Sequence, residues 1–181
     1  SNVKINNSTG YIAYAGLSIS GKIDNIIGGN IYVGFYANIN ISGTITNITI
    51  GDTSYSAFSA INNISGIIKD VVISNVGSTA FDVGNDISGK INNITIGNIG
   101  FSAFYVSNNI SGKITNINIG NVSNDVFYAN NTISGTITNI IMGDISGNYT
   151  FNTGTFSGTI MDVTMGDVNV GFRFTSAISG K

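Results

Sequence analysis

Short groups of alternating apolar and polar residues recur along the whole chain. A representative stretch, residues 87–109, reads ISGKINNITIGNIGFSAFYVSNN. Apolar residues at every second position predict short β-strands with one buried face. The period of an amphipathic helix, which places apolar residues three and four positions apart, is missing throughout. We therefore expect an all-β structure.

The tripeptide Ile-Ser-Gly marks a repeat of 22 or 23 residues. It starts at Ile19, Ile41, Ile64, Ile87, Ile110, Ile133 and Ile178, and Phe156 replaces the isoleucine once. Internal repetition at a fixed period is typical of a solenoid, in which each repeat packs on its neighbours. Because the repeat shows no composition break, we expect residues 1–181 to form a single β-solenoid domain without obvious caps.

Three groups of apolar columns are predicted to form the core. The first joins the Ile of Ile-Ser-Gly to the Ile four residues later, the second joins Ile94 to Ile96, and the third joins Phe104 to Val106, each with its equivalents in the other repeats. The residue between the members of a pair should point outward, because side chains alternate across a strand. Around Tyr149 the aromatic position is displaced by one residue, which predicts a β-bulge.

Two polar columns predict corners between the strands. One consists of Asn25, Asn47, Asp70, Asn93, Asn116, Asn139 and Asp162, and the other of Gly51, Gly97, Gly120, Gly143 and Gly166. Asn tolerates the left-handed backbone region and Gly adopts positive φ without strain, so we expect both columns to supply turns.

Three short strands and three corners in about 23 residues predict a parallel β-helix of about eight coils. We expect a right-handed coil, because connections between parallel strands are right-handed and left-handed coils more often use hexapeptide repeats. The absence of proline agrees with this fold, because nearly every backbone N–H is needed by a neighbouring coil.

These Asn- and Ile-rich repeats resemble those of right-handed parallel β-helix proteins, the pectin-lyase-like superfold, and especially the repeats of microbial surface and adhesin-like proteins. The resemblance covers all 181 residues. It is carried by the repeat pattern, which specifies an architecture rather than a family. It implies an extracellular or cell-surface protein and leaves the activity open.

The composition excludes several classes of function. The chain has 33 Ile and 27 Asn but no Cys, His or Glu. The usual catalytic acids, bases and thiolates are therefore missing, and we expect neither an enzyme nor a bound cofactor. Seven scattered basic residues do not make a nucleic-acid-binding surface. No apolar stretch approaches the ~18 residues of a membrane span, so we expect no membrane insertion.

The two ends of the sequence together make one coil. Residues 178–181 begin a coil and residues 1–18 continue one, and their combined length of 22 residues is that of a repeat. One interpretation is head-to-tail assembly of copies into a filament. Its predicted assembly edges are Ser1, Asn2, Val3 and Ile5 on one side and Ile178, Ser179, Gly180 and Lys181 on the other. The other interpretation is that the chain was cut from a longer repeat protein, or that the match is chance.

The outer surface offers three weaker candidates for a site: a group of acidic residues, two columns that contain threonine, and a column that contains tyrosine. Asp144 and Asp167 share a column, with Asp162 in the next one, and carboxylates so placed could hold Ca²⁺; the alternative is that Asp replaces Asn at corners. Two outward columns contain Thr, as an ice-binding surface does. Lys interrupts both columns, whereas ice binding needs a regular array of Thr. They are Lys22, Thr44, Ile67, Lys90, Lys113, Thr136, Thr159 and Asp24, Thr46, Lys69, Asn92, Thr115, Thr138, Met161.

A further outward column carries tyrosines. It reads Tyr36, Ser59, Asp82, Tyr105, Tyr128, Phe151 and Arg173. Exposed aromatic rings stack on sugars or on neighbouring proteins, although scattered surface tyrosines are common. The favoured function is a structural β-solenoid, an extracellular filament or adhesin-like surface subunit whose partner is a second copy of itself. The alternative is a carbohydrate-binding, carbohydrate-active or ice-binding β-helix, with cell-surface glycans as possible partners.

Overall fold

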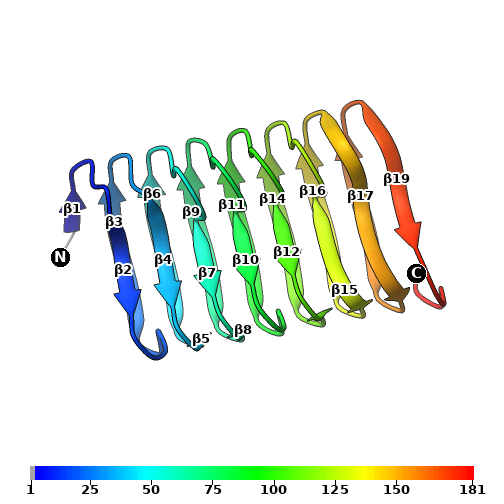
Figure 1. Cartoon of the computed structure of the whole chain (residues 1–181), viewed down its shortest axis with the longest axis horizontal. Coiled ribbons are helices and arrows are strands. Elements are labelled where there is room, and N and C mark those ends of the chain that lie inside the picture. The colour runs from blue at the N-terminus through cyan, green and yellow to red at the C-terminus, as the bar shows by residue number, and fades with distance from the viewer. Residues whose placement is uncertain (1–2) are drawn as a thin grey trace.

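A computed structural model describes residues 3–181 as a parallel β-solenoid (Figure 1). All paired strands are parallel, and these residues form no helix, which confirms the expected all-β fold. The chain makes about seven turns. The eighth predicted coil is not closed within one chain, because its residues lie at opposite ends of the solenoid (Figure 1). Residues 3–181 contain no helix that could span a membrane.

The larger bent strands form an eight-stranded sheet, here called sheet A. Each interior strand has seven residues and pairs in register with the equivalent strand of the next coil, as Ile91 pairs with Ile114. The strands are β1 (Val3–Ile5), β3 (Lys22–Gly28), β6 (Thr44–Ile50), β9 (Ile67–Ile73), β11 (Lys90–Ile96), β14 (Lys113–Ile119), β16 (Thr136–Met142) and β18 (Thr159–Met165).

A second large sheet, here called sheet B, lies on the other side of the core. Its strands are β2 (Tyr11–Ala15), β4 (Val33–Ala37), β7 (Phe58–Ala60), β10 (Phe81–Val83), β12 (Phe104–Val106), β15 (Phe127–Ile133), β17 (Ile145–Phe156) and β19 (Val168–Phe174), with β13 (Asn109–Ile110) beside β15. The short strands β5 (Asn40–Ile41) and β8 (Asn63–Ile64) pair with each other near the Ile-Ser-Gly corner.

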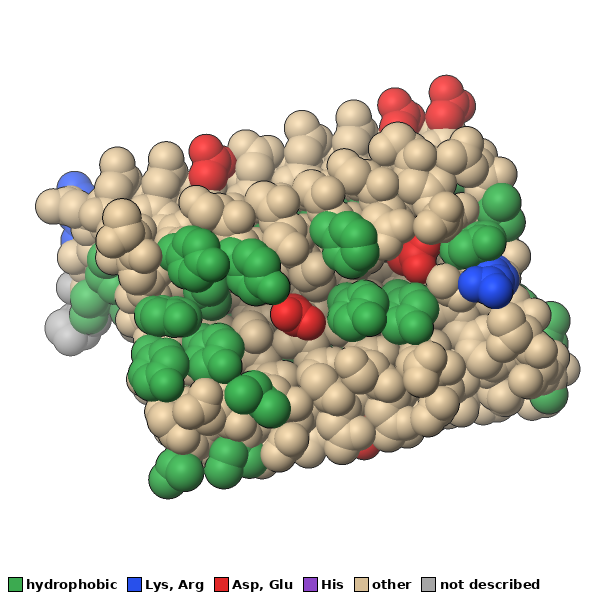
Figure 2. Space-filling model, viewed as in Figure 1, with side chains coloured by type: hydrophobic (Ala, Val, Ile, Leu, Met, Phe, Trp, Pro, Cys, Tyr) green, Lys and Arg blue, Asp and Glu red, His purple; other side chains and the backbone are tan. Residues whose placement is uncertain are grey.

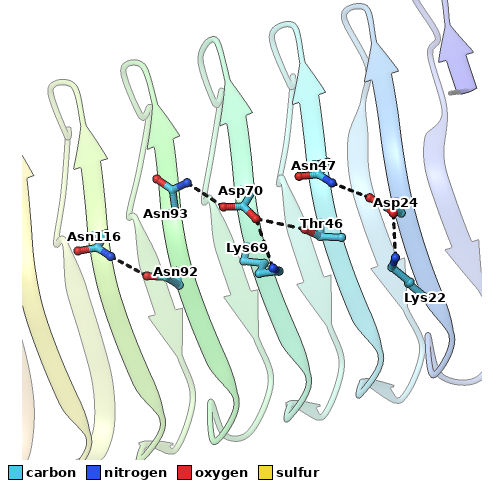
Figure 3. Close-up of polar contacts among 9 residues, drawn as sticks. All are labelled: Lys22, Asp24, Thr46, Asn47, Lys69, Asp70, Asn92, Asn93 and Asn116. Carbon is cyan, nitrogen blue, oxygen red and sulfur yellow. Dashed lines mark hydrogen bonds and ion pairs between the residues drawn. The ribbon is translucent and has the colours of Figure 1, made fainter.

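The coil is right-handed, as expected from the sequence. In Figure 1 the strands of sheet A rise behind those of sheet B, which descend in front while the coils advance toward the C-terminus. Figure 3 shows the same path from the opposite side, with sheet A in front. Both views describe a clockwise path that recedes from an observer at the N-terminal end, which is a right-handed helix.

Stacked identical side chains fill the core. The rings of Phe35, Phe58, Phe81, Phe104, Phe127, Phe151 and Phe172 stack with centroids 4.6–5.2 Å apart. The predicted isoleucine pairs are also buried in the interior coils. A further buried column follows the glycine corner and was not predicted; it contains Ile31, Thr53, Val76, Ile99, Val122 and Ile145, joined by single β-bridges.

The asparagine column does supply the left-handed residues. All seven members have φ between 54° and 60°, and no other non-glycine residue among 3–181 has positive φ. Each lies in the middle of a sheet A strand and bends it, so the two predicted isoleucine pairs belong to one bent strand. Asn and Asp are the side chains that tolerate this region best, which explains why this column contains nothing else.

The glycine column does follow the ends of sheet A strands, as expected for corners, but the expected positive φ is wrong. No glycine between residues 3 and 181 has positive φ. Glycine is required instead because successive coils approach too closely for a side chain: a Cβ on Gly120 would lie 2.6 Å from Oδ1 of Asn98. The glycine of Ile-Ser-Gly is equally confined, because a Cβ on Gly112 would collide with the carbonyl oxygen of Gly89.

The predicted bulge is present in β17. The pairing of β17 shifts register on both sides, between Ala129 and Thr132 of β15 and between Ile145 and Tyr149 of its own sequence. The extra residue lets Phe151 pair with Phe127 and enter the phenylalanine stack. The core column is therefore preserved although the spacing from Phe127 to Phe151 is one residue longer than the repeat.

Candidate functional site

The outer face of sheet A carries a chain of side-chain hydrogen bonds that crosses from coil to coil (Figure 3). The Nδ2 group of Asn47 donates to Oδ1 of Asp24 at 2.9 Å, and Nδ2 of Asn93 donates to Oδ1 of Asp70 at 2.8 Å. Asn116 donates in the same way to Asn92. These bonds satisfy the polar groups of the bend and stabilise the stacking of the coils.

Charges on this face are only partly paired. Lys22 contacts Asp24 at 2.9 Å, and Lys69 contacts Asp70 at 3.5 Å. The hydrogen bond from Lys22 lowers the pKa of Asp24, and the hydrogen bond from Asn93 lowers the pKa of Asp70. A groove of about 570 Å³ follows these strands, and its lining residues are Thr44, Ile67, Lys69, Lys90, Asn92, Lys113, Thr115, Asn116 and Thr138.

The two threonine-containing columns have the predicted register. Lys22, Thr44 and Ile67 pair in sequence across β3, β6 and β9, and the second column runs beside them. Within the second column, however, Thr46 and Thr115 are buried on the outer face, because neighbouring side chains such as Asp70 and Asn92 cover them. The hydroxyl of Thr115 donates to Oδ1 of Asn92 at 2.8 Å, so it is not free to order water. These columns do not present a regular threonine surface.

The acidic corner residues act on the backbone of the next coil. Oδ1 of Asp144 accepts a hydrogen bond of 2.9 Å from the backbone N–H of Asp167, as Asn121 does from Asp144. Asp162 occupies the left-handed column with φ 54°. No group of three or more potential metal-binding carboxylates occurs within residues 3–181. The geometry therefore gives these residues a structural role at the corners.

The outer face of sheet B is aromatic. Tyr14 and Tyr36 stack with parallel rings at 5.4 Å, and Tyr105 and Tyr128 stack at 4.8 Å. A second row on the adjoining loops contains the stacked pair Tyr32 and Tyr55. Figure 2 shows these hydrophobic side chains as separate groups across one face of the solenoid. The first row was predicted from Tyr36 onward, without Tyr14, whereas the second row was not predicted although Tyr32 and Tyr55 are one repeat of 23 residues apart.

The tyrosine column differs from its prediction at one position and contains one unusual acid. Asn152, not Phe151, pairs with Tyr128, because the bulge in β17 sends Phe151 into the core. Asp82 pairs on one side with Ser59 and on the other with Tyr105. Burial raises the pKa of the Asp82 carboxyl. The sequence placed Asp82 in this column but gave no sign of its environment.

A cation lies on the same face near the C-terminal end. The guanidinium group of Arg173 lies over the ring of Tyr149, with Cζ 5.2 Å from the ring centroid. Asp125 lies on the coil that precedes the coil of Tyr149, and it is buried. It accepts hydrogen bonds from the backbone N–H of Tyr149 at 3.0 Å and from Nδ2 of Asn152 at 2.8 Å. The sheet B face thus binds a cationic group of its own chain.

The predicted assembly edges lie at opposite ends of the solenoid. Val3 and Ile5 belong to β1, whereas Ile178 is joined to Phe156 by a β-bridge and Lys181 donates its backbone N–H to Gly158 at 2.9 Å. Ser1 and Asn2 lie outside the described residues. The described members of each edge lie together, Val3 with Ile5 and Ile178 with Ser179, Gly180 and Lys181, but the two edges could meet only between two molecules.

Comparisons with protein-family models, curated proteins and solved structures returned no match. The parallel solenoid indicated by the repeats is shown, whereas a pectin-lyase-like or adhesin-like family is not.

Proposed function

We propose that this chain is a structural β-solenoid that assembles head-to-tail with copies of itself, as an extracellular filament or surface subunit. The surface location is part of the proposal and is supported by the resemblance of the repeats to microbial surface proteins. Antibody labelling of intact cells, compared with permeabilised cells, tests it.

The observation that carries the proposal is the exposure of core positions on the end coils. Phe172 is 50% exposed, whereas its stacking neighbour Phe151 is fully buried. Ile178 is 64% exposed and Val3 46%, although the equivalent positions of the interior coils are buried. Sheet A ends in β1 and β18, each with one paired edge. An open strand edge beside exposed apolar side chains is a template for further pairing.

The two end coils also differ in side-chain size in a complementary way. Ala13 and Ala15 of β2 pair with Phe35 and Ala37, so they occupy the two core positions of their coil. At the other end the same two columns hold Phe172 and Phe174. If the register continued between molecules, these large rings would pack against the two alanines. Large side chains facing small ones are a feature of well-packed cores.

Sedimentation velocity at increasing protein concentration tests this assembly. We expect the sedimentation coefficient of chain 1–181 to rise with concentration and electron microscopy to show rods longer than a single solenoid. Phe172→Lys should abolish the rise, because the end coil cannot bury an unpaired charge. Val72→Lys is the matched control, because Val72 is equally apolar and 49% exposed but lies on the side of sheet A. A wild-type protein that stays monomeric throughout would contradict the proposal.

A second candidate function is glycan binding at the sheet B face. The stacked pairs Tyr14–Tyr36 and Tyr105–Tyr128 favour it, because flat aromatic surfaces pack against the apolar faces of sugar rings. A glycan-array screen with wild-type protein and Tyr128→Ala would test it. We expect loss of the bound glycans in the variant, and an array with no bound glycan would exclude this candidate.

A further inference from the structure

Asp82 is a carboxylate without a partner. It lies on the outward side of β10 and is only partly exposed. Neither of the two ion pairs formed within residues 3–181 includes it, and burial is the one influence that acts on its pKa. A carboxylate withdrawn from water without a cation or a donor is unfavourable. The buried acid of this face, Asp125, has two hydrogen-bond donors.

Aromatic side chains flank Asp82 along the solenoid axis. Tyr105 is its direct neighbour in the next coil, and the ring of Phe101 lies 6.4 Å from that of Tyr105. Ser59, the neighbour in the preceding coil, is small. The tyrosine column is therefore interrupted at Ser59 and Asp82 for two coils, between Tyr36 and Tyr105. Figure 2 shows one acidic side chain between two groups of hydrophobic side chains on this face.

Arg173 indicates what fits such an interruption. Its guanidinium group lies 5.2 Å from the ring centroid of Tyr149 and occupies the same outward column two strands beyond Tyr128. Aromatic faces attract cations through their quadrupole, and a nearby carboxylate adds to that attraction. At the Asp82 position the aromatic rings and the carboxylate are present, but no cationic side chain among residues 3–181 pairs with the carboxylate.

We propose that Asp82, Tyr105 and Phe101 form a binding site for a small organic cation, an alkylammonium group held by the carboxylate and the aromatic faces. A neutral ligand such as a sugar hydroxyl is less suited, because it gives the carboxylate a hydrogen bond but no compensating charge. The site is on the side of the solenoid, so it is independent of assembly through the end coils.

Choline and its neutral isostere, in which a tert-butyl group replaces the trimethylammonium group, form the test pair. They have the same shape and differ in charge. Amide chemical shifts of the intact chain would be followed by NMR during titration with each compound. We expect choline to shift the amides of Asp82 and Tyr105 and to bind about tenfold more tightly than the isostere, as a cation–π contact beside a carboxylate requires.

Two pairs of variants separate this site from non-specific binding. Asp82→Asn and Tyr105→Leu should each weaken choline binding by about fivefold or more, because they remove the charge or the aromatic face. Asp52→Asn and Tyr14→Leu are the controls. Asp52 is an exposed carboxylate at a corner, and Tyr14 is an exposed tyrosine distant from Asp82, so both variants should leave choline binding unchanged. Equal affinity for choline and its isostere, no localised shift, or unchanged binding by Asp82→Asn would overturn the proposal.

Discussion

The amide of Asn93 donates a hydrogen bond of 2.8 Å to the carboxylate of Asp70, directly below it on the preceding coil. Both residues have left-handed backbone geometry, with φ of 55° and 56°. The same side chain thus makes the bend possible and links it to its neighbour. Asn139 and Asn116 repeat this arrangement, so at these coils Asn or Asp serves both the bend and the contact between coils.

Substitutions at Asn93 should separate these two contributions. Asn93→Gly keeps the left-handed backbone and loses the hydrogen bond, so we expect it to lower the free energy of unfolding by about 1 kcal/mol. Asn93→Ala also forces an alanine into the left-handed region and should cost about 1–2 kcal/mol more. Urea denaturation followed by circular dichroism would measure both. Equal stability of the two variants would show that backbone geometry does not select this residue.

The glycines of Ile-Ser-Gly should be intolerant wherever a coil lies beneath them. Gly112→Ala would press a methyl group against the carbonyl oxygen of Gly89 and should destabilise by about 3 kcal/mol, the upper range for overpacking. Gly21→Ala is the matched control, because no atom lies within 4 Å of the added carbon in the first coil. We expect that control to change the stability by less than about 0.5 kcal/mol. Similar thermal unfolding of both variants would disprove close approach as the reason for glycine.

The phenylalanine stack should be most sensitive at its middle. Phe104→Ala opens a cavity between two rings and should lower the unfolding free energy by about 3–5 kcal/mol. Phe172→Ala should cost only about 1 kcal/mol at low protein concentration, because half of its side chain remains in water. Denaturant titrations at one dilute concentration would compare them, and a larger loss for Phe172→Ala would contradict the assigned core.

Replacement of Asp82 should change the pH dependence of stability. Burial raises the pKa of Asp82 above its ordinary value of 3.8, so the fold favours its neutral form. Its contribution is therefore most favourable below pH 3.8 and is lost as the pH rises through the raised pKa. Asp82→Asn, which cannot ionise, should be more stable than the wild type at neutral pH.

The same comparison at acidic pH provides the control. Below pH 3.8 the advantage of Asp82→Asn should disappear, because Asp82 is then protonated in both the folded and the unfolded wild type. Asp24 and Asp70, whose pKa values are lowered, lose stabilising effect as the pH falls, but they do so equally in both proteins. Thermal midpoints measured from pH 3 to pH 7 on the two proteins would show a constant offset if Asp82 were not the cause.

Most of the fold was predictable because each column repeats. Ile94 and Phe104 recur at a fixed interval, so their burial followed from the period alone, and the left-handed role of Asn93 followed from its chemistry. The glycine column was misinterpreted because two physical reasons select the same residue. Either positive φ or close approach can require glycine, and the coordinates show that close approach is the reason at Gly120.

The candidate sites were less predictable, because they depend on interruptions of the repeat rather than on the repeat itself. Asp82 was visible in its column, but its lack of a partner depends on which side chains surround it. The displacement at Phe151 was noticed, but the sequence did not show that the bulge would restore the ring to the core and leave Asn152 outside. Thr46 was expected to point outward, and neighbouring side chains cover it.

The strands of sheet A keep one register from coil to coil, which makes the interior coils outside the β17 bulge interchangeable units. Lys90 pairs with Lys113 in the same way as Ile91 pairs with Ile114, so regular interior coils present the same columns to their neighbours. A duplicated repeat inserted between two interior coils would meet the same columns on both sides. The length of the solenoid can therefore change by whole coils without redesign of the core, while Asp82 and its aromatic neighbours keep their local arrangement.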